Sequence, residues 1–506
     1  MSDLVALLVA LPIFGSIVAF LASLVRSETG WPIAVATSAV QVLAAGVLAT
    51  RAFGDEPVRY VVGGFTAPFG IELVVDGLSA TMALLVAVVA LGVLGYARVA
   101  GPRTNAFYAT YLLLVTGLTG MSITGDVFNM YVFLEITGLA AYALVASGDG
   151  GEAALAALKY LLVGTVGASL FLLGIGYAFV ATGTLNMADL ASQLAAVGYT
   201  DPLVQASFAL LVAGLFVKVA VFPVHTWQPS AYASSPDSVS AFISALVSTV
   251  AAYALIRIVF TVYTVEFLEA NEFARTVLLA GAATSIVLGS VIAVAQTEIK
   301  RVLAYSSISQ FGLVVAAIGV ANVTALTGAV IHLVGHAIMK GGLFLATGII
   351  RRKTGAETVE DYEGIAERLP VGAGAFGVLA LAMVGVPPAI GFVGKWYIAL
   401  GAVEAEAWPI AVVIFASTLL TLAYLARVIE RIYFREYDGP ADADDTDGTG
   451  EITSDVVADG GGFTPSTVSF GMRATVLLAA VAAVALGAVA VEYGQLLEPT
   501  IERLLS

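Results

Sequence analysis

The chain has 506 residues, of which 59% are hydrophobic and only 12% are charged, and its mean hydropathy is +0.96. Soluble domains average about 45–50% apolar and about 25% charged residues, so a water-soluble core could not hide this much apolar surface. The net charge of −15 argues against nucleic-acid binding, which needs a basic face, and the lack of cysteine excludes disulfides and thiolate-held metal centres. The composition therefore predicts a protein whose solvent is the lipid bilayer.

Fourteen segments are candidates for membrane-spanning helices, each of which needs about 20 mostly apolar residues. The first apolar run, from Leu4 to Leu24, has no cationic segment before it and is closely followed by others. We therefore interpret it as a membrane helix and not as a cleaved signal peptide. The predicted spans are 3–24, 31–50, 74–97, 106–124, 126–147, 157–181, 204–223, 238–263, 275–296, 301–320, 324–350, 372–400, 408–434 and 473–493.

Lys and Arg residues predict the orientation, because cytoplasmic loops carry an excess of them. Loops and span ends after odd-numbered spans hold thirteen, and those after even-numbered spans hold four. The first set is Arg26, Arg98, Arg103, Lys159, Lys300, Arg301, Arg351, Arg352, Lys353, Arg368, Arg431, Arg435 and Arg473; the second is Arg51, Arg59, Arg275 and Arg503. The odd-span loops are therefore predicted in the cytoplasm and both termini outside. The polar segment 436–467, rich in Asp, Gly and Thr, is predicted to be a cytoplasmic linker.

Few ionisable residues lie deep inside the predicted spans, where a charge costs at least about 2.5–3.5 kcal/mol and usually serves a function. They are Glu135 in the fifth span, Lys218 in the seventh, Lys340 in the eleventh and Lys395 in the twelfth. A single lysine near a span end would otherwise be interpreted as reaching to the membrane surface. We interpret Arg257 and Arg427, which lie nearer the ends of their spans, in that way.

Prolines lie close to two of these lysines. Pro223 follows Lys218, and Pro387 and Pro388 precede Lys395. Proline removes a helix hydrogen bond and can break the helix. Broken helices beside buried charge indicate an ion path in transporters.

Two of the three histidines, His332 and His336, are four residues apart and share one helix face, which Lys340 continues. A metal-binding pair is the alternative at this spacing. The sequence has no HExxH motif and no acid nearby, so a proton relay is the better interpretation.

Five stretches resemble the antiporter-type subunits of Mrp cation/proton antiporters, and the related proton-pumping subunits of complex I and membrane-bound hydrogenases. They are residues 125–144, 217–246, 298–314, 332–348 and 385–396. Two further stretches, 67–80 and 183–191, are most similar to the D-type member of the Mrp subunits.

The resemblance implies an all-α membrane fold of about 14 helices, with two inverted five-helix repeats whose seventh and twelfth helices are broken. The implied parts are an N-terminal three-helix segment 1–105, repeats 106–263 and 275–434, the acidic loop 436–467 and a last helix within 472–506. The resemblance also makes Glu135 and Lys218 the central charge pair of a proton path, and Lys395 its outlet-side lysine.

One departure concerns the eighth span. Many relatives carry a lysine where this chain has Ser248 and Thr249. We expect these hydroxyls to bridge the path from Lys218 to His332 and His336, or this half-channel to be altered.

The resemblance implies a proton-translocating subunit of a multi-subunit Na+/H+ antiporter in the cell membrane, with other Mrp subunits as partners. The alternative is a non-redox, proton-pumping subunit of an NADH- or deazaflavin-quinone oxidoreductase or of a membrane-bound hydrogenase. A third class of function is a structural scaffold that transports no ion. The sequence contains no nucleotide-binding loop, catalytic triad or cofactor motif. We therefore expect a transporter subunit and not an enzyme, and we expect no bound cofactor or metal.

The orientation can be tested with a single cysteine, since the chain has none of its own. Gly448→Cys, in the 436–467 segment, should resist membrane-impermeant thiol reagents in intact cells and react once the cells are permeabilised. Ready labelling in intact cells would contradict the predicted topology.

Overall fold

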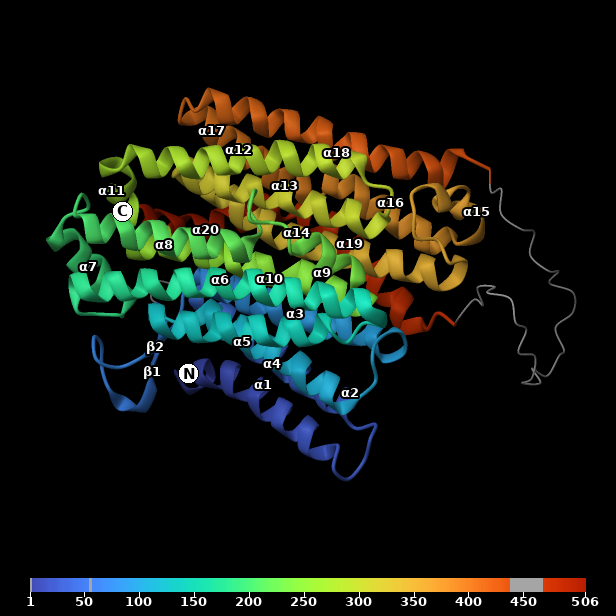
Figure 1. Cartoon of the computed structure of the whole chain (residues 1–506), viewed down its shortest axis with the longest axis horizontal. Coiled ribbons are helices and arrows are strands. Elements are labelled where there is room, and N and C mark those ends of the chain that lie inside the picture. Colours follow the sequence, from blue (N-terminus) through green and yellow to red (C-terminus); the bar gives the residue numbers. More distant parts are fainter. Residues whose placement is uncertain (1, 54–56, 437–466) are drawn as a thin grey trace, which may run out of the picture.

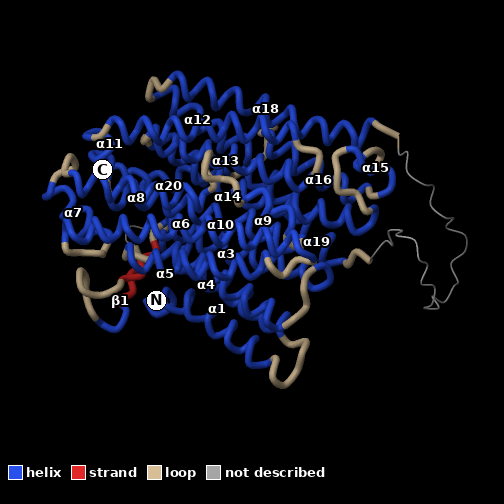
Figure 2. Tube along the Cα trace, in the orientation of Figure 1, coloured by secondary structure: helices blue, strands red, loops and turns tan. Residues whose placement is uncertain are grey.

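The computed structural model describes residues 2–53, 57–436 and 467–506, which form a bundle of long helices running side by side (Figure 1, Figure 2). Helices suit a bilayer because their backbone polar groups bond within the segment. Among the described residues, thirteen helices are long and apolar enough to cross a membrane. The predicted span 372–400 corresponds to two shorter helices, α16 (Pro370–Val384) and α17 (Ile390–Glu404). The predicted all-α membrane fold is confirmed, while most of the predicted linker 436–467 lies outside the described residues.

The helices from α1 to α18 run broadly from one edge of the bundle to the other, and α19 and α20 return to pack beside α3 and α14 (Figure 1). The first are α1 (Ser2–Ala22), α2 (Gly30–Ala52), β1 (Val58–Val61), η1 (Val62–Gly64), β2 (Glu72–Val75) and α3 (Gly77–Ala100). Next come α4 (Asn105–Ile123), α5 (Val127–Val145), α6 (Gly150–Thr182), α7 (Met187–Val197), α8 (Pro202–Val219), α9 (Gln228–Ser234), α10 (Asp237–Arg257) and η2 (Ile258–Val262). The last are α11 (Thr264–Ala270), α12 (Glu272–Ala295), α13 (Ile299–Val320), α14 (Val323–Thr354), η3 (Glu360–Tyr362), α15 (Ile365–Arg368), α16, α17, α18 (Trp408–Phe434), α19 (Phe470–Ala488) and α20 (Ala490–Leu505).

The bundle has two ends. The hairpin end holds strands β1 and β2, which pair antiparallel with Val58 opposite Val75, and also α7, α11 and the C-terminus. At the α15 end lie α15 and the loops that follow α3, α5, α9, α12 and α14 (Figure 1). The short helices α7 and α11 at the hairpin end lie outside the predicted spans.

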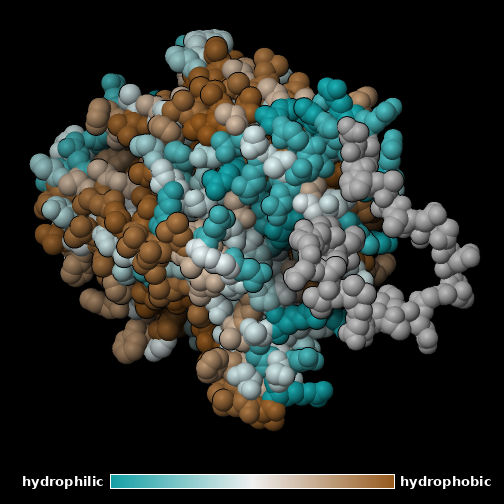
Figure 3. Space-filling view, turned by 45° about the vertical axis from the view of Figure 1, so that its right-hand side comes forward, coloured by the Kyte–Doolittle hydropathy of each residue, from teal (hydrophilic) through white to brown (hydrophobic). Residues whose placement is uncertain are grey.

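The interior of the bundle is formed by α10, α13 and α14. Every residue of α10 is buried, and nearly all of α13 and α14 is buried as well. The outer helices instead expose large apolar side chains, such as Leu162 on α6 and Leu419 on α18. Hydrophobic residues cover much of the visible side of the molecule, and polar residues gather towards the α15 end (Figure 3). This distribution suits lipid around the sides and water at the end.

One arginine that we predicted to reach the membrane surface is buried. Arg257, at the end of α10, is only 8% exposed, and its Nη2 lies 2.5 Å from Asp76 Oδ1. Asp76 also caps the N-terminus of α3 in a capping box with Ser79. Burial raises the pKa of Asp76, but the charge and hydrogen bonds of Arg257 and Ser79 outweigh it and lower the pKa to about 2. The surface interpretation was therefore wrong for Arg257, because a partner distant in sequence neutralises its charge.

Asp76→Asn should destabilise the protein, because it leaves the buried Arg257 without its counter-charge, a loss of about 3–5 kcal/mol. The thermal unfolding temperature of the purified protein in detergent measures the effect. Asp201→Asn is the matched control, since Asp201 caps α8 through the amide of Leu203 and asparagine caps helices equally well. Equal unfolding temperatures for the two variants would show that the Asp76–Arg257 pair contributes little.

Candidate functional site

The structure brings Glu135 and Lys218 together. Lys218 lies in the last turn of α8, and its Nζ is 3.8 Å from Oε1 of Glu135 on α5. The Lys218 side chain is 7% exposed and that of Glu135 is 29% exposed. Nζ also donates a hydrogen bond of 3.3 Å to the hydroxyl of Tyr142. Gly138 makes room for the tyrosine, since a Cβ at that position would lie 3.0 Å from the Tyr142 hydroxyl oxygen.

The backbone breaks immediately after Lys218. Helix α8 ends at Val219, Ala220 has a φ of 66°, and α9 begins only at Gln228. A helix end leaves carbonyl groups without partners. Here the indole Nε1 of Trp227 donates to the carbonyl of Val217 at 2.8 Å, and the Ser248 hydroxyl donates to that of Lys218 at 3.3 Å. Side chains from outside the helix therefore stabilise the break beside the lysine.

Ser248 and Thr249, the predicted bridging residues, make different contacts. Ser248 Oγ accepts a hydrogen bond of 3.1 Å from Gln228 Nε2 and lies 3.5 Å from the Tyr232 hydroxyl. The Thr249 hydroxyl instead donates to the carbonyl of Ala245 on its own helix, at 2.7 Å. Ser248 is thus the hydroxyl that joins a polar chain to the backbone of Lys218.

On α14, His332, His336 and Lys340 are all buried. Lys340 Nζ donates to the carbonyl of Leu303 at 2.5 Å and to the hydroxyl of Ser306, both on α13. The two imidazole rings are 6.4 Å apart, and their nitrogens form no hydrogen bond within the described residues. Buried polar groups normally have partners, so this stretch has unused capacity to donate and accept protons.

Lys395 lies beside the second helix break. Its Nζ donates to the carbonyls of Met383 and Val384 at 2.8 and 3.1 Å, and so caps the C-terminal end of α16. A cation is stabilised there by the partial negative charge of the helix end. The adjacent Gly394 packs against the backbone of His332, where a Cβ would approach within 2.9 Å. The close packing of α17 on α14 thus places Lys395 next to the histidine pair.

Sequence reasoning missed two polar residues that contact buried lysines. Tyr142 contacts Lys218, and Asp237 forms an ion pair of 2.8 Å with Lys300. Asp237 directly precedes the predicted span 238–263. The Ser235–Pro236–Asp237 sequence before a long apolar run was the signal, since Asp is favoured at a helix start.

These side chains offer a distinct chemistry. Amines, imidazoles, a carboxylate and hydroxyls can pass protons, and a carboxylate next to an amine can change which of the two holds the proton. The arrangement of α8–α9 and α16–α17 repeats one device, a broken helix with a buried lysine at or near the break. Such half-helices in the membrane interior are typical of ion transporters.

Comparisons with known proteins agree with this class. Residues 124–421 match the family described as NADH:quinone oxidoreductase/Mrp antiporter, TM. The chain belongs to this family, and is an antiporter-like subunit of the kind found in Mrp and complex I-type complexes.

Two curated relatives represent both branches. The chain is 45% identical to the N subunit of the NADH-quinone oxidoreductase of Desulforudis audaxviator over 418 residues, or 80% of this chain and 82% of the relative. It is 30% identical to the D subunit of the Na(+)/H(+) antiporter of Bacillus subtilis over 404 residues, or 79% of this chain and 81% of the relative.

Among solved structures, the chain is similar to one in the membrane-bound sulfane sulfur reductase, an archaeal respiratory membrane complex. The TM-score is 0.87 at 29% identity, and the match covers 99% of this chain and 98% of the other. All three relatives are subunits of membrane complexes that contain several different subunits. This chain is likewise a subunit of a hetero-oligomeric membrane complex.

Proposed function

We propose that this chain is the proton-translocating subunit of a multi-subunit monovalent cation/proton antiporter that exchanges H+ for Na+ across the cell membrane. The observation that carries the proposal is the loose Glu135–Lys218 pair inside the bundle. At 3.8 Å its N–O separation exceeds the roughly 2.7–2.9 Å of a charge-assisted hydrogen bond, so the two groups attract each other by charge and can separate without breaking a direct hydrogen bond. The named activity of the Bacillus subtilis relative supports the choice of Na+ as the exchanged cation.

The proposed proton path joins the two helix breaks. It begins at Glu135 and Lys218, and Ser248 with Gln228 and Tyr232 forms the polar chain that leads away from Lys218. It continues on α14 through Lys340, His336 and His332, and ends at Lys395, with Thr249 adjoining the bridging segment. The path uses side chains alone and needs no metal or cofactor.

In this mechanism the charge of Lys218 alternates. When Glu135 approaches, it stabilises the ammonium form and Lys218 keeps its proton. When the pair separates, a buried ammonium left with the neutral Tyr142 hydroxyl is unfavourable, so Lys218 releases its proton. Lys395 is held by neutral carbonyls, so it can accept and release a proton without breaking an ion pair.

A second candidate is a proton-pumping subunit of a redox-driven complex. It is favoured by the 45% identical relative, which is named as an NADH-quinone oxidoreductase subunit, and by the similarity to a sulfur reductase complex. The side chains of the path would act in the same way, and the driving force would differ. Vesicles containing the purified complex separate the two: an imposed Na+ gradient drives proton flux in the antiporter, whereas an electron donor drives it in the pump.

We further propose the orientation and the division of the chain. The α15 end, which carries Arg103, Arg301, Arg351 and Arg368, faces the cytoplasm, and both termini lie on the opposite side. The repeats comprise 106–263 and 275–434, and the other Mrp-type subunits are the partners.

Neutral replacement of the buried charges would leave transport intact if the chain were only a scaffold.

Lys395→Ala should lower transport strongly while the protein remains inserted and assembled, because it removes the amine next to His332 that caps α16. Proton flux in vesicles, at matched amounts of complex, measures the effect. Lys353→Ala, at the end of α14, is the control and should retain normal flux. Normal flux with Lys395→Ala would remove this lysine from the path.

Glu135→Ala and Lys218→Ala should each abolish transport, because neither variant keeps a lysine that alternates between charged and neutral forms. The double variant should be no worse than either single one, since coupled residues are not additive. Na+-dependent proton flux of all three variants, at matched expression, tests this. Independent losses that multiply would mean that the two residues do not act as a pair, and substantial transport by either single variant would contradict the mechanism.

A further inference from the structure

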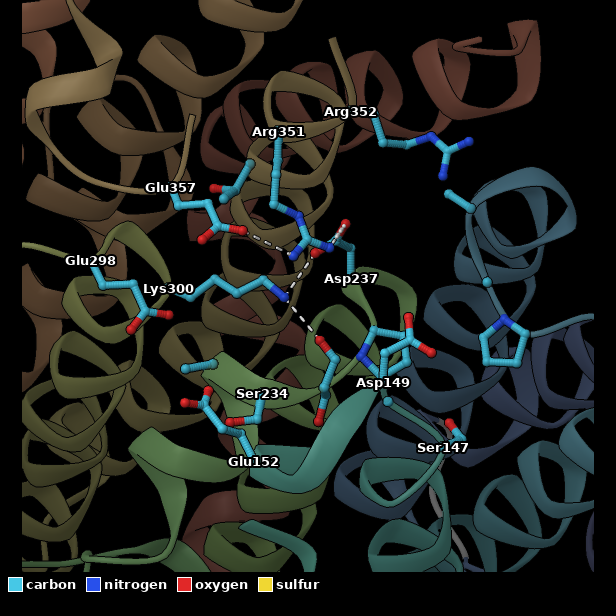
Figure 4. A pocket seen from close by; sticks show the side chains of 18 of the residues that line it. Ser147, Asp149, Glu152, Ser234, Asp237, Glu298, Lys300, Arg351, Arg352 and Glu357 are labelled. Atoms are coloured by element: carbon cyan, nitrogen blue, oxygen red, sulfur yellow. Dashed lines mark hydrogen bonds and ion pairs between the residues drawn. The ribbon is translucent and has the colours of Figure 1, made fainter. Parts of the chain in front are cut away.

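A second group of charged residues lies outside the path described above, at the α15 end. A cavity of about 640 Å³ is lined there by the loops after α3, α5 and α9 and by the facing ends of α13 and α14. Carboxylates and cations surround it, among them Glu152, Glu298, Arg351 and Glu357 (Figure 4). Lys300 and Arg351 point towards each other across its floor, with Asp237 between them (Figure 4).

The floor of the cavity is a buried trio of charges. Asp237 Oδ1 lies 2.8 Å from Lys300 Nζ, and Oδ2 lies 3.0 Å from Arg351 Nη2. The side chains of Asp237 and Lys300 are only 4% and 5% exposed, although both residues line the cavity. Lys300 also donates to the carbonyl of Ser235 at 2.9 Å and to the hydroxyl of Ser240 at 3.3 Å.

The trio holds two cations against one carboxylate. Glu357 approaches Arg351 at 3.5 Å from the solvent side, and Tyr96 on α3 packs with Asp237 against Gly348 of α14. A guanidinium does not release its proton in proteins, whereas an ammonium does. Lys300 is thus the cation of this trio that can give up a proton, and it lies at the boundary between the cavity and the interior.

Two helices lead from this boundary to Lys340. On α13, the carbonyl of Leu303, which accepts the hydrogen bond of Lys340, lies one helical turn beyond Lys300. On α14, Thr347 lines the cavity and lies seven residues from Lys340, about 10 Å along the helix axis and on nearly the same face. The cavity and Lys340 therefore lie along the same two helices, α13 and α14.

We propose that the Asp237–Lys300 pair is the proton port of the α15 end, through which protons pass between the aqueous cavity and Lys340. This inference rests on the proposed proton-translocating function and adds a connection from the path to water. It also accounts for the lack of a lysine on α10, because Lys340 then exchanges protons through Lys300 as well as through Ser248.

The proton balance of the port is simple. The Lys300 ammonium gives one proton towards the neutral amine of Lys340, by way of the Ser306 hydroxyl and water, and becomes a neutral amine. Asp237 meanwhile keeps its ion pair with Arg351. A hydronium ion from the cavity then restores the Lys300 ammonium, so that one proton has moved from water to Lys340, and the reverse sequence releases one.

The decisive variant is Lys300→Arg, which keeps the positive charge and the ion pair with Asp237 but cannot release a proton. Proton flux of the purified complex in vesicles should fall at least about tenfold, with assembly and thermal unfolding temperature unchanged. Lys353→Arg, the same substitution at the same end but outside the cavity lining, is the control and should behave as the wild type.

A second variant covers the case in which Lys300→Arg does not pack well. Asp237→Asn removes the charge that favours the ammonium, so half-maximal flux should require a lower pH on the α15 side, and only on that side. A purely structural ion pair predicts lower stability with an unshifted pH profile. Wild-type flux with Lys300→Arg, or an unshifted profile with Asp237→Asn, would overturn the port. If the port is overturned but Glu135→Ala still abolishes flux, the proposed proton-translocating function stands. If Glu135→Ala also retains flux, the proposed function is contradicted as well.

Discussion

The cost of a charge without a partner in the membrane interior is the constraint on which this structure depends. Four of the six lysines in the sequence are buried, and each has found oxygen atoms to hold its amine. Lys218 has Glu135 and Tyr142, Lys300 has Asp237, Lys340 has α13, and Lys395 has the end of α16. Helix packing therefore serves to supply these partners as much as to bury apolar surface.

The partners differ in strength, and this difference sorts the charges by role. The Asp76–Arg257 contact at 2.5 Å joins an arginine that stays charged to a capping carboxylate, which suits a permanent tie between helices. The Glu135–Lys218 contact at 3.8 Å is loose, and Lys340 and Lys395 are held by neutral oxygens. Amines with weak or neutral partners can change their protonation without dismantling the bundle, and Lys300 can do so because Asp237 still has Arg351 as a second cation.

Helix α10 connects the two ends of the molecule. Arg257 at one end pairs with α3, and Asp237 at the other pairs with α13 and α14. Between them every residue of the helix is buried, and Ser248 contacts the first helix break from its middle. Ion pairs thus hold α10 at both ends, whereas the ends of α8 and α16 at the two breaks are held by hydrogen bonds to backbone carbonyls from Trp227, Ser248 and Lys395.

The sequence by itself determined the membrane fold, the positions of the spans and the residues that carry charge inside them. These are local properties, because the length of an apolar run and the presence of a lysine within it need no knowledge of neighbours. The resemblance added the Glu135–Lys218 pairing. The tertiary structure alone decided which other charges meet: Arg257 finds Asp76 across 181 positions of the chain, and Lys340 finds Leu303 across 37. Asp237 acquired its two cations in the same way. Pairings of this kind depend on how helices from distant parts of the chain pack, which no local pattern of residues encodes.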